Sequence, residues 1–456
     1  MISAAYGTIV ENELSVLIIA YYFPPNAAVG GKRLARFCRY LPEFGIQPTV
    51  VTLDQDSCAT LDNSLANLPD TRVERARPNS TPLDWYQRIT RSRSAEETSS
   101  ASFSPSPSNM SPLRFLSKSV VALLTIPDQY WGWYFPAVKA AARLMKERKF
   151  DAILSSGPPW TAHAVAHRFA RRFDIPWIAD FRDGWVSDQW RDEHPDWRYK
   201  VDWWIENRWV EDASLILATT NALRNSLLST HPDLPEDRIV TITNGFDENL
   251  PVKKGLEAAG EDNHTVLLHA GELYRGRRID AFCSALANLL HSGAFGSKPP
   301  KVVFLGGIEP EIEQTARSAA PELFDHGIVE FRPRIAWKEV QAKMSAADIL
   351  LLVQGDHPTA IPAKFFEYLQ SGKPILGIGQ GAALKEIIEA TQSGFVADSR
   401  DAHAIAAALK RTLQMKPRTP QEVSRFTGNY HFKRLSERLA DNIRRIVTQP
   451  QLAAKY

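Results

Sequence analysis

TAIPAKFFEYLQSGKPILGIGQG, residues 359–381, is the stretch around which the second half of the chain is organised. It follows an apolar run at 347–353 that is typical of a buried strand. Proline often occupies the first position of a helix, so we expect a helix to begin at Pro362. Gly372 and Pro374 end that helix and lead into another short strand. The stretch therefore predicts a strand–helix–strand unit.

Two charged side chains lie near the start of this predicted helix. Lys364 and Glu367 are three residues apart in the sequence, so they share one face of the helix. The exposed N–H groups of a helix N-terminus favour an anion, and Lys364 adds a cation for a phosphate. The carboxylate of Glu367 can accept hydrogen bonds from a vicinal diol such as a ribose. Together the two side chains predict a nucleotide site.

Length and composition limit the class of protein. The 456 residues exceed the size at which one core usually stops growing, which predicts two domains of roughly 200 residues. A net charge of +2 gives no global field that would attract nucleic acid. The three cysteines have no zinc-like spacing and fit a reducing cytoplasm. We expect neither a signal peptide nor a membrane-spanning segment, because no suitable apolar run occurs.

The first half begins with the same kind of unit. The apolar run 15–22 predicts a central parallel strand, which a helix over 32–44 and a strand over 48–53 follow. Gly30 and Gly31 lie in the connecting turn. They either let the backbone approach a ligand closely or simply form a tight turn. The order strand, turn, helix, strand predicts a right-handed βαβ unit.

Candidate polar groups follow later strands of the first half. His163 lies one turn into a helix after the strand 151–155, where ligands collect in open α/β sheets, although a lone histidine there can equally be packed. His167 lies one turn further on, and a zinc pair would need a third ligand. The next strand ends in DFRD, residues 180–183, which is either a reactive group or an internal Asp–Arg pair. The DQD at 54–56 can bind a metal–nucleotide but is more typical of a turn.

Two aromatic-rich segments allow two interpretations each. Residues 113–133 are apolar and aromatic, with Arg114 and Lys118 among them. They suit either an amphipathic segment at a membrane surface or a core helix. Six tryptophans between Trp185 and Trp209 either line a sugar or lipid site or fill a core.

Composition divides the chain into two strand–helix halves. Residues 92–112 are rich in Ser and Pro and predict a flexible excursion. The polar stretch 248–263 predicts a linker, after which the alternation of strands and helices starts again. We therefore expect parallel-sheet domains at 1–247 and 264–416. A helical tail over 417–456 can cross back to the first domain.

Seven pieces of the chain, taken in order, resemble the glycosyltransferase family 4 proteins. They are VLIIAYYFPPNAAVGGKR (16–33), SSGPPWTAH (155–163), IADFRDGW (178–185), ITNGFD (242–247), HAGELYRGRR (269–278), IPAKFFEYLQSGKPIL (361–376) and GQG (379–381). The resemblance covers nearly the whole chain and is closest to members that act in polysaccharide or exopolysaccharide assembly. It implies an α/β fold of the GT-B type, in which two Rossmann-like parallel-sheet domains face an interdomain cleft.

The resemblance also implies an activity. The protein would be a retaining, metal-independent hexosyltransferase that needs no cofactor. It would move a sugar from a UDP- or GDP-sugar to a glycan or lipid-linked acceptor in cell-surface polysaccharide assembly, without binding nucleic acid. It would act in the cytoplasm and could contact the inner face of the plasma membrane peripherally through 113–133.

Site residues follow from the same resemblance. The donor would contact Gly30, Gly31, Gly271, Arg277, Lys364, Glu367 and Gly381. The catalytic residues would be His163, Asp180, Asp183, Arg277 and Lys364, with Arg182 also facing the acceptor. Arg277 and Lys364 would stabilise the charge that grows on the leaving nucleoside diphosphate. Glu367 matches the second glutamate of the family's Glu-x7-Glu signature, whereas Thr359 replaces the first, which leaves the donor sugar open.

Two other functions are open at this point. Gly377-x-Gly379-x-x-Ala382 fits a dinucleotide fingerprint with Asp398 about 20 residues on, which would suit an NAD(P)-dependent oxidoreductase. That fingerprint is expected in the first βα turn of its domain, and here it lies late in the second domain. Thr359 in place of a signature glutamate instead suggests a non-catalytic scaffold with a decayed transferase site.

Overall fold

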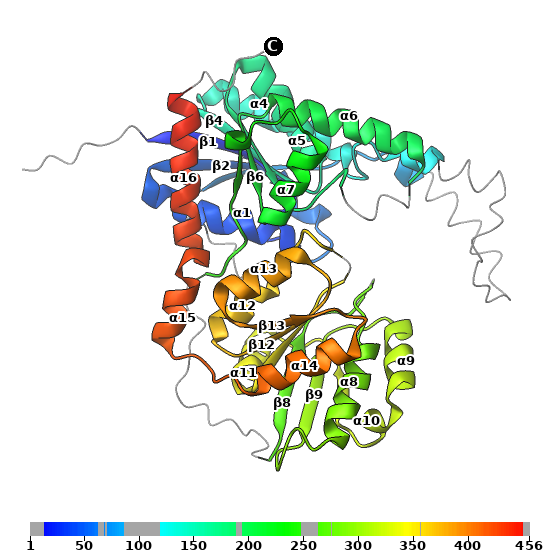
Figure 1. Ribbon diagram of the computed structural model, residues 1–456. Helices are drawn as coiled ribbons and strands as arrows, with labels where there is room; N and C mark the ends of the chain where they lie inside the picture. The colour runs from blue at the N-terminus through cyan, green and yellow to red at the C-terminus, as the bar shows by residue number, and fades with distance from the viewer. Residues whose placement is uncertain are drawn as a thin grey trace, which may run out of the picture. The chain divides into compact units, whose positions relative to one another are not determined.

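The computed structural model describes residues 13–62, 68, 71–85, 119–187, 194–247, 263–274, 276–355 and 357–449. The chain forms two compact units. Figure 1 colours their helices and strands by residue number, from blue at the N-terminus to red at the C-terminus. The first unit contains the chain up to Thr219, Leu223–Ile242 and the residues from Ser436 onward. The second contains Thr220–Ala222 and Thr243–Leu435. The Ser/Pro-rich stretch 92–112, the residues 113–118 and the linker residues 248–262 lie outside the described part of the chain.

A seven-stranded parallel sheet forms the centre of the first unit. Its strands are β1 (Leu14–Ile19), β2 (Ile46–Leu53), β3 (Arg72–Ala76), β4 (Ala152–Gly157), β5 (Trp177–Phe181), β6 (Leu215–Ala218) and β7 (Ile239–Thr241). They are ordered β3-β2-β1-β4-β5-β6-β7, and every neighbouring pair is parallel. The order reverses between β1 and β4. In open α/β sheets, ligands bind beyond the carboxyl ends of the two strands at such a switch point.

Helices cover both faces of this sheet. They are α1 (Val29–Tyr40), α4 (Tyr134–Glu147), α5 (Thr161–Phe173), α6 (Asp196–Asp212) and α7 (Asn221–Thr230). α1 leads from β1 to β2 and α5 leads from β4 to β5, in opposite directions across the sheet, so right-handed connections place them on opposite faces. α4 and α5 pack against each other on one face. Trp133, Trp177 and Phe181 are fully buried in the core under these helices.

The last helix of the described chain, α16 (Phe432–Thr448), returns to the first unit (Figure 1). Its apolar side chains, among them Leu439 and Ile443, are fully buried. Arg438 Nη2 donates a hydrogen bond to the carbonyl oxygen of Thr241 at 2.9 Å, and the guanidinium group of Arg444 binds the carbonyl oxygen of Phe44. The helix therefore supplies part of the core of a unit whose other elements come from the start of the chain.

The tail is two helices and not one continuous helix. α15 (Pro420–Thr427) has a capping box at its start, in which the side chains of Thr419 and Glu422 satisfy each other's backbone N–H groups. The chain then leaves helical geometry, because the backbone around His431 pairs with Phe246. The N–H group of Phe246 donates to the carbonyl oxygen of Tyr430 at 3.0 Å. This backbone pairing separates α15 from α16.

A six-stranded parallel sheet forms the second unit. Its strands are β8 (Thr265–Ala270), β9 (Pro300–Leu305), β10 (Val329–Arg332), β11 (Ile349–Val353), β12 (Ile375–Ile378) and β13 (Gly394–Ala397). They are ordered β10-β9-β8-β11-β12-β13. The helices are α8 (Asp280–His291), α9 (Pro310–Ala319), α10 (Pro321–Asp325), α11 (Trp337–Ala346), α12 (Lys364–Ser371), α13 (Ala382–Thr391) and α14 (Ala402–Leu413).

Two separate apolar clusters lie against this second sheet. Phe282 of α8 and Leu409 of α14 belong to one cluster, whereas Phe365 of α12 and Ile387 of α13 belong to the other. The sheet therefore has helices on both faces, as in a Rossmann-like fold. The predicted α/β class with two Rossmann-like parallel-sheet units is confirmed. None of the described helices is long and apolar enough to cross a bilayer.

The helix of the organising stretch begins later than predicted. α12 starts at Lys364, and Pro362 lies before it. The N–H group of Phe365 bonds to the carbonyl oxygen of Pro362 at 2.9 Å, which is a tight three-residue turn of the kind that often precedes a helix. Lys364 is therefore the first residue of the helix, and Glu367 still lies in the first turn. Gly372 ends the helix, as predicted, and the structure shows it in a left-handed conformation.

Candidate functional site

The carboxyl ends of the parallel strands of the second unit lie at one edge of its sheet. The strand order reverses between β8 and β11, so the crevice beyond these two strands is the expected ligand site. Lys364 and Glu367 follow β11, whereas Gly271 and Arg277 follow β8. Gly381 follows β12, the next strand in the sheet. The topology thus brings the predicted donor residues of this unit to one edge.

Lys364 is held by a histidine that the sequence analysis did not single out. His269 lies on β8, and its Nδ1 is 3.0 Å from the carbonyl oxygen of Leu351. A carbonyl oxygen can only accept, so Nδ1 carries the proton and Nε2 is left as an acceptor. Lys364 Nζ donates to this Nε2 at 3.0 Å. One feature of the sequence marks His269, because it is the polar residue in the otherwise apolar core of the strand TVLLHA.

Burial changes the proton affinity of both groups. The pKa of Lys364 falls to about 7, mainly because its ammonium group is desolvated and secondly because the Arg277 cation is near. The pKa of His269 lies well below its ordinary value, first through burial and then through the charge of Lys364. The imidazole is therefore neutral at physiological pH. The lysine is poised to take up a proton when an anion arrives.

Arg277 contributes a second cation close to Lys364. Its Nη1 donates to the carbonyl oxygen of Glu272 at 2.6 Å, and its guanidinium carbon lies 4.1 Å from the centre of the Tyr274 ring. This cation–π contact fixes the guanidinium plane. The negative charge of Glu367 acts in the opposite direction on Lys364 and raises its pKa. The two cations and this carboxylate therefore belong to one electrostatic cluster.

Glycines keep this cluster open to a close approach. Gly271 has a φ of +145°, and a Cβ atom there would lie 2.5 Å from Lys364 Nζ. Gly306, after β9, has a φ of +140°, and its Cβ would lie 2.6 Å from the carbonyl oxygen of Gly271. Both positions therefore require glycine. Gly381 stands at the N-cap of α13, where a Cβ would lie 2.9 Å from Gln354 Oε1.

Asp180 in the first unit is part of a buried ion pair. Arg33 Nη2 donates to Asp180 Oδ1 at 3.0 Å, and the two side chains are only 3% and 1% exposed. Ser156 Oγ donates to Asp180 Oδ2 at 2.7 Å, and Arg33 also donates to the carbonyl oxygen of Ile242 at 2.8 Å. Asp180, on β5, thus joins β4 to α1, the helix that follows β1. These contacts match the interpretation of Asp180 as part of an internal Asp–Arg pair. The partner is Arg33, which the sequence analysis did not identify.

Gly30 and Gly31 lie in the first turn of α1 and not in a connecting turn before it, because the helix begins at Val29, earlier than predicted. A Cβ atom at Gly30 would lie 2.1 Å from Arg182 Nη1, and one at Gly31 would lie 3.1 Å from the backbone of Phe23. Arg182 Nε donates to the carbonyl oxygen of Gly157 at 3.3 Å. Asp183 is exposed beside it. Gly30 and Gly31 therefore permit close packing within the first unit, and their predicted contact with a donor stays a prediction.

His163 lies inside the first core. It is fully buried, and its Nδ1 is 2.8 Å from Ser155 Oγ, which also accepts a hydrogen bond from Trp177 Nε1 at 2.8 Å. Burial lowers the pKa of His163 to about 3. The imidazole is therefore neutral and packed among aromatic rings. Because the ring is buried, an acceptor at the surface cannot contact it in this arrangement. The expected contact between His163 and an acceptor stays a prediction.

Of the residues considered as metal ligands, His167 binds another side chain and the DQD sequence forms a turn. His167 Nε2 lies 2.7 Å from Asp212 Oδ2, and the DQD sequence at 54–56 leads into a short 3₁₀ turn, Gln55–Ser57. Within the described ranges of the chain, no three His, Cys, Asp or Glu side chains are arranged to hold a metal ion.

The dinucleotide-like fingerprint has a packing role. A Cβ atom at Gly377 would lie 3.1 Å from the side chains of Ile388 and Val396, so this glycine permits close packing of α13 and β13 on β12. Asp398 accepts hydrogen bonds from Gln380 Nε2 at 2.9 Å and from the N–H group of Arg400 at 2.9 Å. These contacts fix the loop and do not favour an oxidoreductase.

Comparisons with known proteins agree with this fold. Residues 102–250 match the sequence model of Glycosyltransferase Family 4, and residues 264–415 match that of Glycosyl transferases group 1. Alpha-maltose-1-phosphate synthase of Mycobacterium tuberculosis H37Rv is 23% identical over 213 residues, which are 44% of this chain and 54% of the relative. The Mycolicibacterium smegmatis enzyme of that name is 22% identical over 214 residues, with the same coverage. The chain therefore spans about half the length of the curated relatives it matches.

Solved structures show the same architecture over nearly the full chain. Sucrose-phosphate synthase from Thermosynechococcus elongatus has a TM-score of 0.62 at 15% identity, covering 95% of this chain and 99% of the other. Anabaena Alr3699/HepE in complex with UDP and glucose has a TM-score of 0.53 at 16% identity, covering 96% and 98%. The two Rossmann-like units and these structural neighbours define the GT-B fold class. Within that class, the chain belongs to glycosyltransferase family 4.

Proposed function

We propose that this protein is a retaining, metal-independent hexosyltransferase that uses a UDP- or GDP-sugar. The acceptor would be a glycan or a lipid-linked sugar in the assembly of a cell-surface polysaccharide. The observation that carries this proposal is the cluster of Lys364, Arg277 and His269 at the switch point of the second sheet. Such a cluster suits a ligand that brings a concentrated negative charge.

The chemistry of transfer explains why two cations are needed. As the bond between the sugar and the diphosphate breaks, negative charge grows on the departing phosphate oxygen. Arg277 and Lys364 would stabilise that charge, with the N-terminal N–H groups of α12 adding to the field. His269 accepts a hydrogen bond from Lys364 Nζ, so it fixes the direction of the remaining N–H bonds. Glu367, in the first turn of α12, would hold the ribose.

Related proteins support a uridine nucleotide as the first donor to test. The Anabaena structure contains UDP and glucose, and WaaG, which has a TM-score of 0.54 at 14% identity, is named as a glycosyltransferase of lipopolysaccharide biosynthesis. We propose that this protein acts in the cytoplasm and contacts the inner face of the plasma membrane peripherally through 113–133. Val120 and Leu123 in this segment are 37% and 60% exposed, which supports such a contact.

A nucleotide screen of the full chain tests the donor assignment. We expect UDP or GDP to raise the melting temperature and NAD(P) to leave it unchanged, and we expect slow hydrolysis of the matching nucleotide sugar. Glu367→Ala and Arg277→Ala should each weaken nucleotide binding. Glu311→Ala, an exposed glutamate of α9, is the matched control and should bind like the parent. If both site variants bound the nucleotide with unchanged affinity, the donor site would not lie at this edge of the sheet.

Nucleotide binding without any hydrolysis or transfer of a sugar, across a full set of donors and glycan acceptors, would instead support the scaffold alternative. The assay therefore separates a wrong site from an inactive enzyme.

A further inference from the structure

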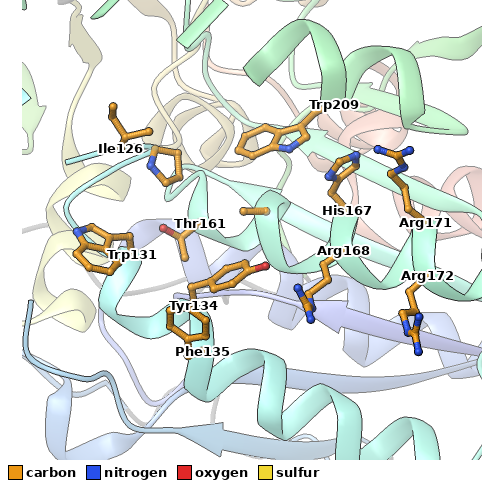
Figure 2. Close-up of a pocket in the computed structure, with 12 residues that line it drawn as sticks. Ile126, Trp131, Tyr134, Phe135, Thr161, His167, Arg168, Arg171, Arg172 and Trp209 are labelled. Carbon is orange, nitrogen blue, oxygen red and sulfur yellow. The ribbon is translucent and has the colours of Figure 1, made fainter. Parts of the chain in front are cut away.

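A cavity of about 810 Å³ lies between α4 and α5 of the first unit (Figure 2). It has no part in the charged cluster of the second unit. One end is apolar and is formed by Ile126, Pro127, Trp131 and Phe135. The side chain of Phe135 is 65% exposed although it lines the cavity, which is costly for a phenylalanine in water. This apolar end extends to the surface of the unit.

The other end of the cavity is basic. Arg168, Arg171 and Arg172 line it from successive turns of α5 (Figure 2). Arg171 lies 3.7 Å from Asp212, whereas Arg168 and Arg172 form no ion pair with any residue that the structure describes. Arginines in a last helical turn stabilise the helix dipole, which would account for two of them. That explanation does not account for the apolar wall opposite them.

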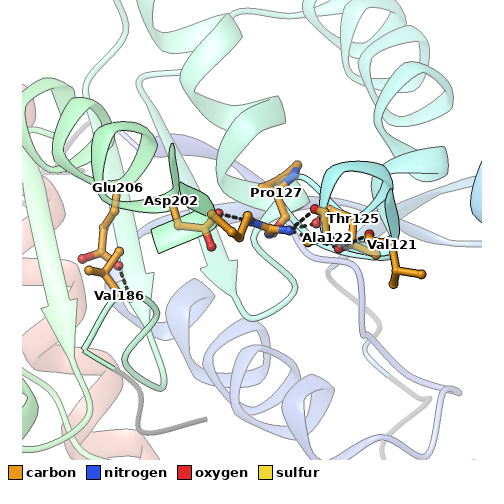
Figure 3. Close-up of polar contacts among 8 residues, drawn as sticks. Val121, Ala122, Thr125, Pro127, Val186, Asp202 and Glu206 are labelled. Atoms are coloured by element: carbon orange, nitrogen blue, oxygen red, sulfur yellow. Dashed lines mark hydrogen bonds and ion pairs between the residues drawn. The ribbon is translucent and has the colours of Figure 1, made fainter. Parts of the chain in front are cut away.

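The apolar wall is held in place before any ligand binds. Arg198 of α6 is only 3% exposed, and its Nη2 donates to the carbonyl oxygens of Thr125 and Pro127 at 3.0 and 2.9 Å. Its Nη1 binds the carbonyl oxygen of Ala122, and its Nε donates to Asp202 Oδ1 at 2.6 Å (Figure 3). One buried guanidinium group thus binds three backbone carbonyl oxygens in the segment that carries Ile126 and Pro127.

A second anchor joins this segment to α5. Asp128 accepts hydrogen bonds from the N–H group and the Oγ1 hydroxyl of Thr161, at 2.8 and 2.7 Å. Thr161 is the first residue of α5, so Asp128 caps the helix that carries the arginines. Trp131 Nε1 donates to the carbonyl oxygen of Leu124 at 2.8 Å, which fixes the indole ring. A preformed wall lowers the ordering cost of binding.

We propose that this cavity binds a phosphate-bearing lipid, with the phosphate on Arg168 and Arg172 and the first part of the chain along Trp131 and Phe135. Guanidinium groups bind phosphate oxygens in pairs, and the aromatic wall suits an acyl or prenyl chain. The volume matches small-molecule pockets, which span about 300–1,000 Å³, so the distal part of the chain leaves past Phe135 into the bilayer. This inference deepens the membrane contact of the proposed function and does not depend on the donor site.

Vesicle sedimentation of the full chain tests the basic end. We expect binding to phosphatidylcholine vesicles that contain phosphatidic acid and little binding to pure phosphatidylcholine. The variant Arg168→Glu/Arg172→Glu, at exposed positions, should bind at least tenfold more weakly. Lys139→Glu/Lys146→Glu makes the same charge change at exposed positions of α4 outside the cavity and should bind like the parent. Equal losses in the two variants, or no binding by the parent, would overturn the proposal.

A soluble short-chain lipid tests the apolar end and the source of the phosphate. We expect dihexanoyl phosphatidic acid, below its micelle concentration, to bind at least tenfold more tightly than inorganic phosphate or glycerol phosphate. Phe135→Ala should weaken the binding of the lipid and leave the binding of inorganic phosphate and glycerol phosphate unchanged. Phe173→Ala removes a 52% exposed phenylalanine of α5 outside the cavity and should have no effect. Equal affinity for inorganic phosphate and the lipid would reduce the site to an anion site and overturn the proposal.

The same variants separate this inference from the proposed function. UDP or GDP should stabilise Arg168→Glu/Arg172→Glu as much as the parent, because the donor cluster lies in the other unit. If the protein bound the lipid but no nucleotide, the lipid site would be supported and the donor assignment would be wrong. If it bound the nucleotide but no lipid, the donor assignment would be supported and the lipid site would be wrong.

Discussion

Lys364 is the residue whose protonation should be visible in binding. Its pKa of about 7 lies below its ordinary value of 10.5 because its ammonium group is desolvated beside Arg277. A bound diphosphate favours the protonated form, so binding takes up a proton once the pH exceeds 7. We expect nucleoside diphosphate affinity to fall by up to about tenfold per pH unit between pH 7.5 and 9. Calorimetry in buffers of different ionisation enthalpy measures both the affinity and the proton uptake.

Two substitutions at this position serve as the comparison. Lys364→Arg keeps a charge that does not titrate, so its affinity for the nucleoside diphosphate should not change with pH over this range. Lys364→Met should bind the nucleoside diphosphate weakly, and its affinity should not change with pH either. Folding stability should change with pH in the opposite direction to nucleotide affinity. Because the folded pKa is lowered, the lysine costs stability in full below pH 7, and the cost fades as the pH rises toward 10.5. If the affinity of both variants still fell with rising pH, the proton would be taken up by another group.

Asp180 should matter for the stability of the first unit. Its carboxylate is the charge partner of Arg33, and both side chains are almost fully buried. Asp180→Asn would leave the Arg33 cation uncompensated, which we expect to cost about 3–5 kcal/mol in the free energy of unfolding. Urea denaturation followed by tryptophan fluorescence measures it. Glu313→Ala breaks the exposed pair with Arg317 and should cost no more than about 1 kcal/mol.

The charged residues of the second unit could be proposed from the sequence because they follow strong strand patterns. Lys364 and Glu367 stand at fixed spacing after an apolar run, and a family resemblance added Arg277. The partners His269 and Arg33 could not be proposed in this way. Each meets its partner across a long stretch of chain, His269 with Lys364 and Arg33 with Asp180. Such pairs depend on the strand order, which local patterns do not determine.

At the scale of elements, β13 depends on one glycine. Gly394 starts this edge strand, and a Cβ atom there would lie 1.7 Å from the carbonyl oxygen of Ile375 in β12. Gly394→Ala must therefore displace the strand, and we expect a loss of roughly 2–4 kcal/mol. Chemical denaturation of the second unit, followed by far-UV circular dichroism, measures this loss.

Gly428 supplies the matched control for this substitution. It has helical dihedral angles, and no atom lies within 4 Å of a Cβ built there. Gly428→Ala should be neutral or stabilise by up to about 1 kcal/mol, because it reduces the freedom of the unfolded chain. If both variants lost the same stability, the close approach of β13 to β12 would not be the cause.

The strength of the local pattern decided which elements could be predicted. The central strands β1 and β11 contain apolar runs of four or more residues, and β4 begins with the apolar residues AIL; all three were predicted within a few residues. The edge strands β3 and β13, with the sequences RVERA and GFVA, were not predicted. They are short and only partly buried, so they have neither a long apolar run nor a clear alternation. The start of α12 was misplaced because a tight turn at Pro362 resembles a helix start in sequence.

At the scale of the whole molecule, α16 should stabilise a unit that begins at the other end of the sequence. Ile443 is fully buried in that helix, so we expect Ile443→Ala to cost about 2–5 kcal/mol in the unfolding of the first unit. Trp337 is the only one of the 12 tryptophans after residue 242, so tryptophan fluorescence reports mainly on the first unit.

The exposed Asp441 of the same helix gives the control. Asp441→Ala should change the fluorescence transition by no more than about 0.5 kcal/mol. If Ile443→Ala left that transition unchanged as well, the helix would contribute nothing to the first core.

Length and the repeated strand–helix order were sufficient to predict two Rossmann-like units, since each unit needs its own core. Local patterns could not establish that the first unit also takes in Ser436 and the residues beyond it. An amphipathic helix shows that it has an apolar face, but its sequence does not name the surface that covers that face.

The late position of α16 has a consequence for biosynthesis. Domains usually fold in the order in which they leave the ribosome. Here the first unit lacks a helix until the second unit has been translated, a delay on the order of tens of seconds at roughly 5–20 residues per second. During that interval the surface that will receive Leu439 and Ile443 is uncovered, and a nascent-chain chaperone that shields apolar surface would find its target there.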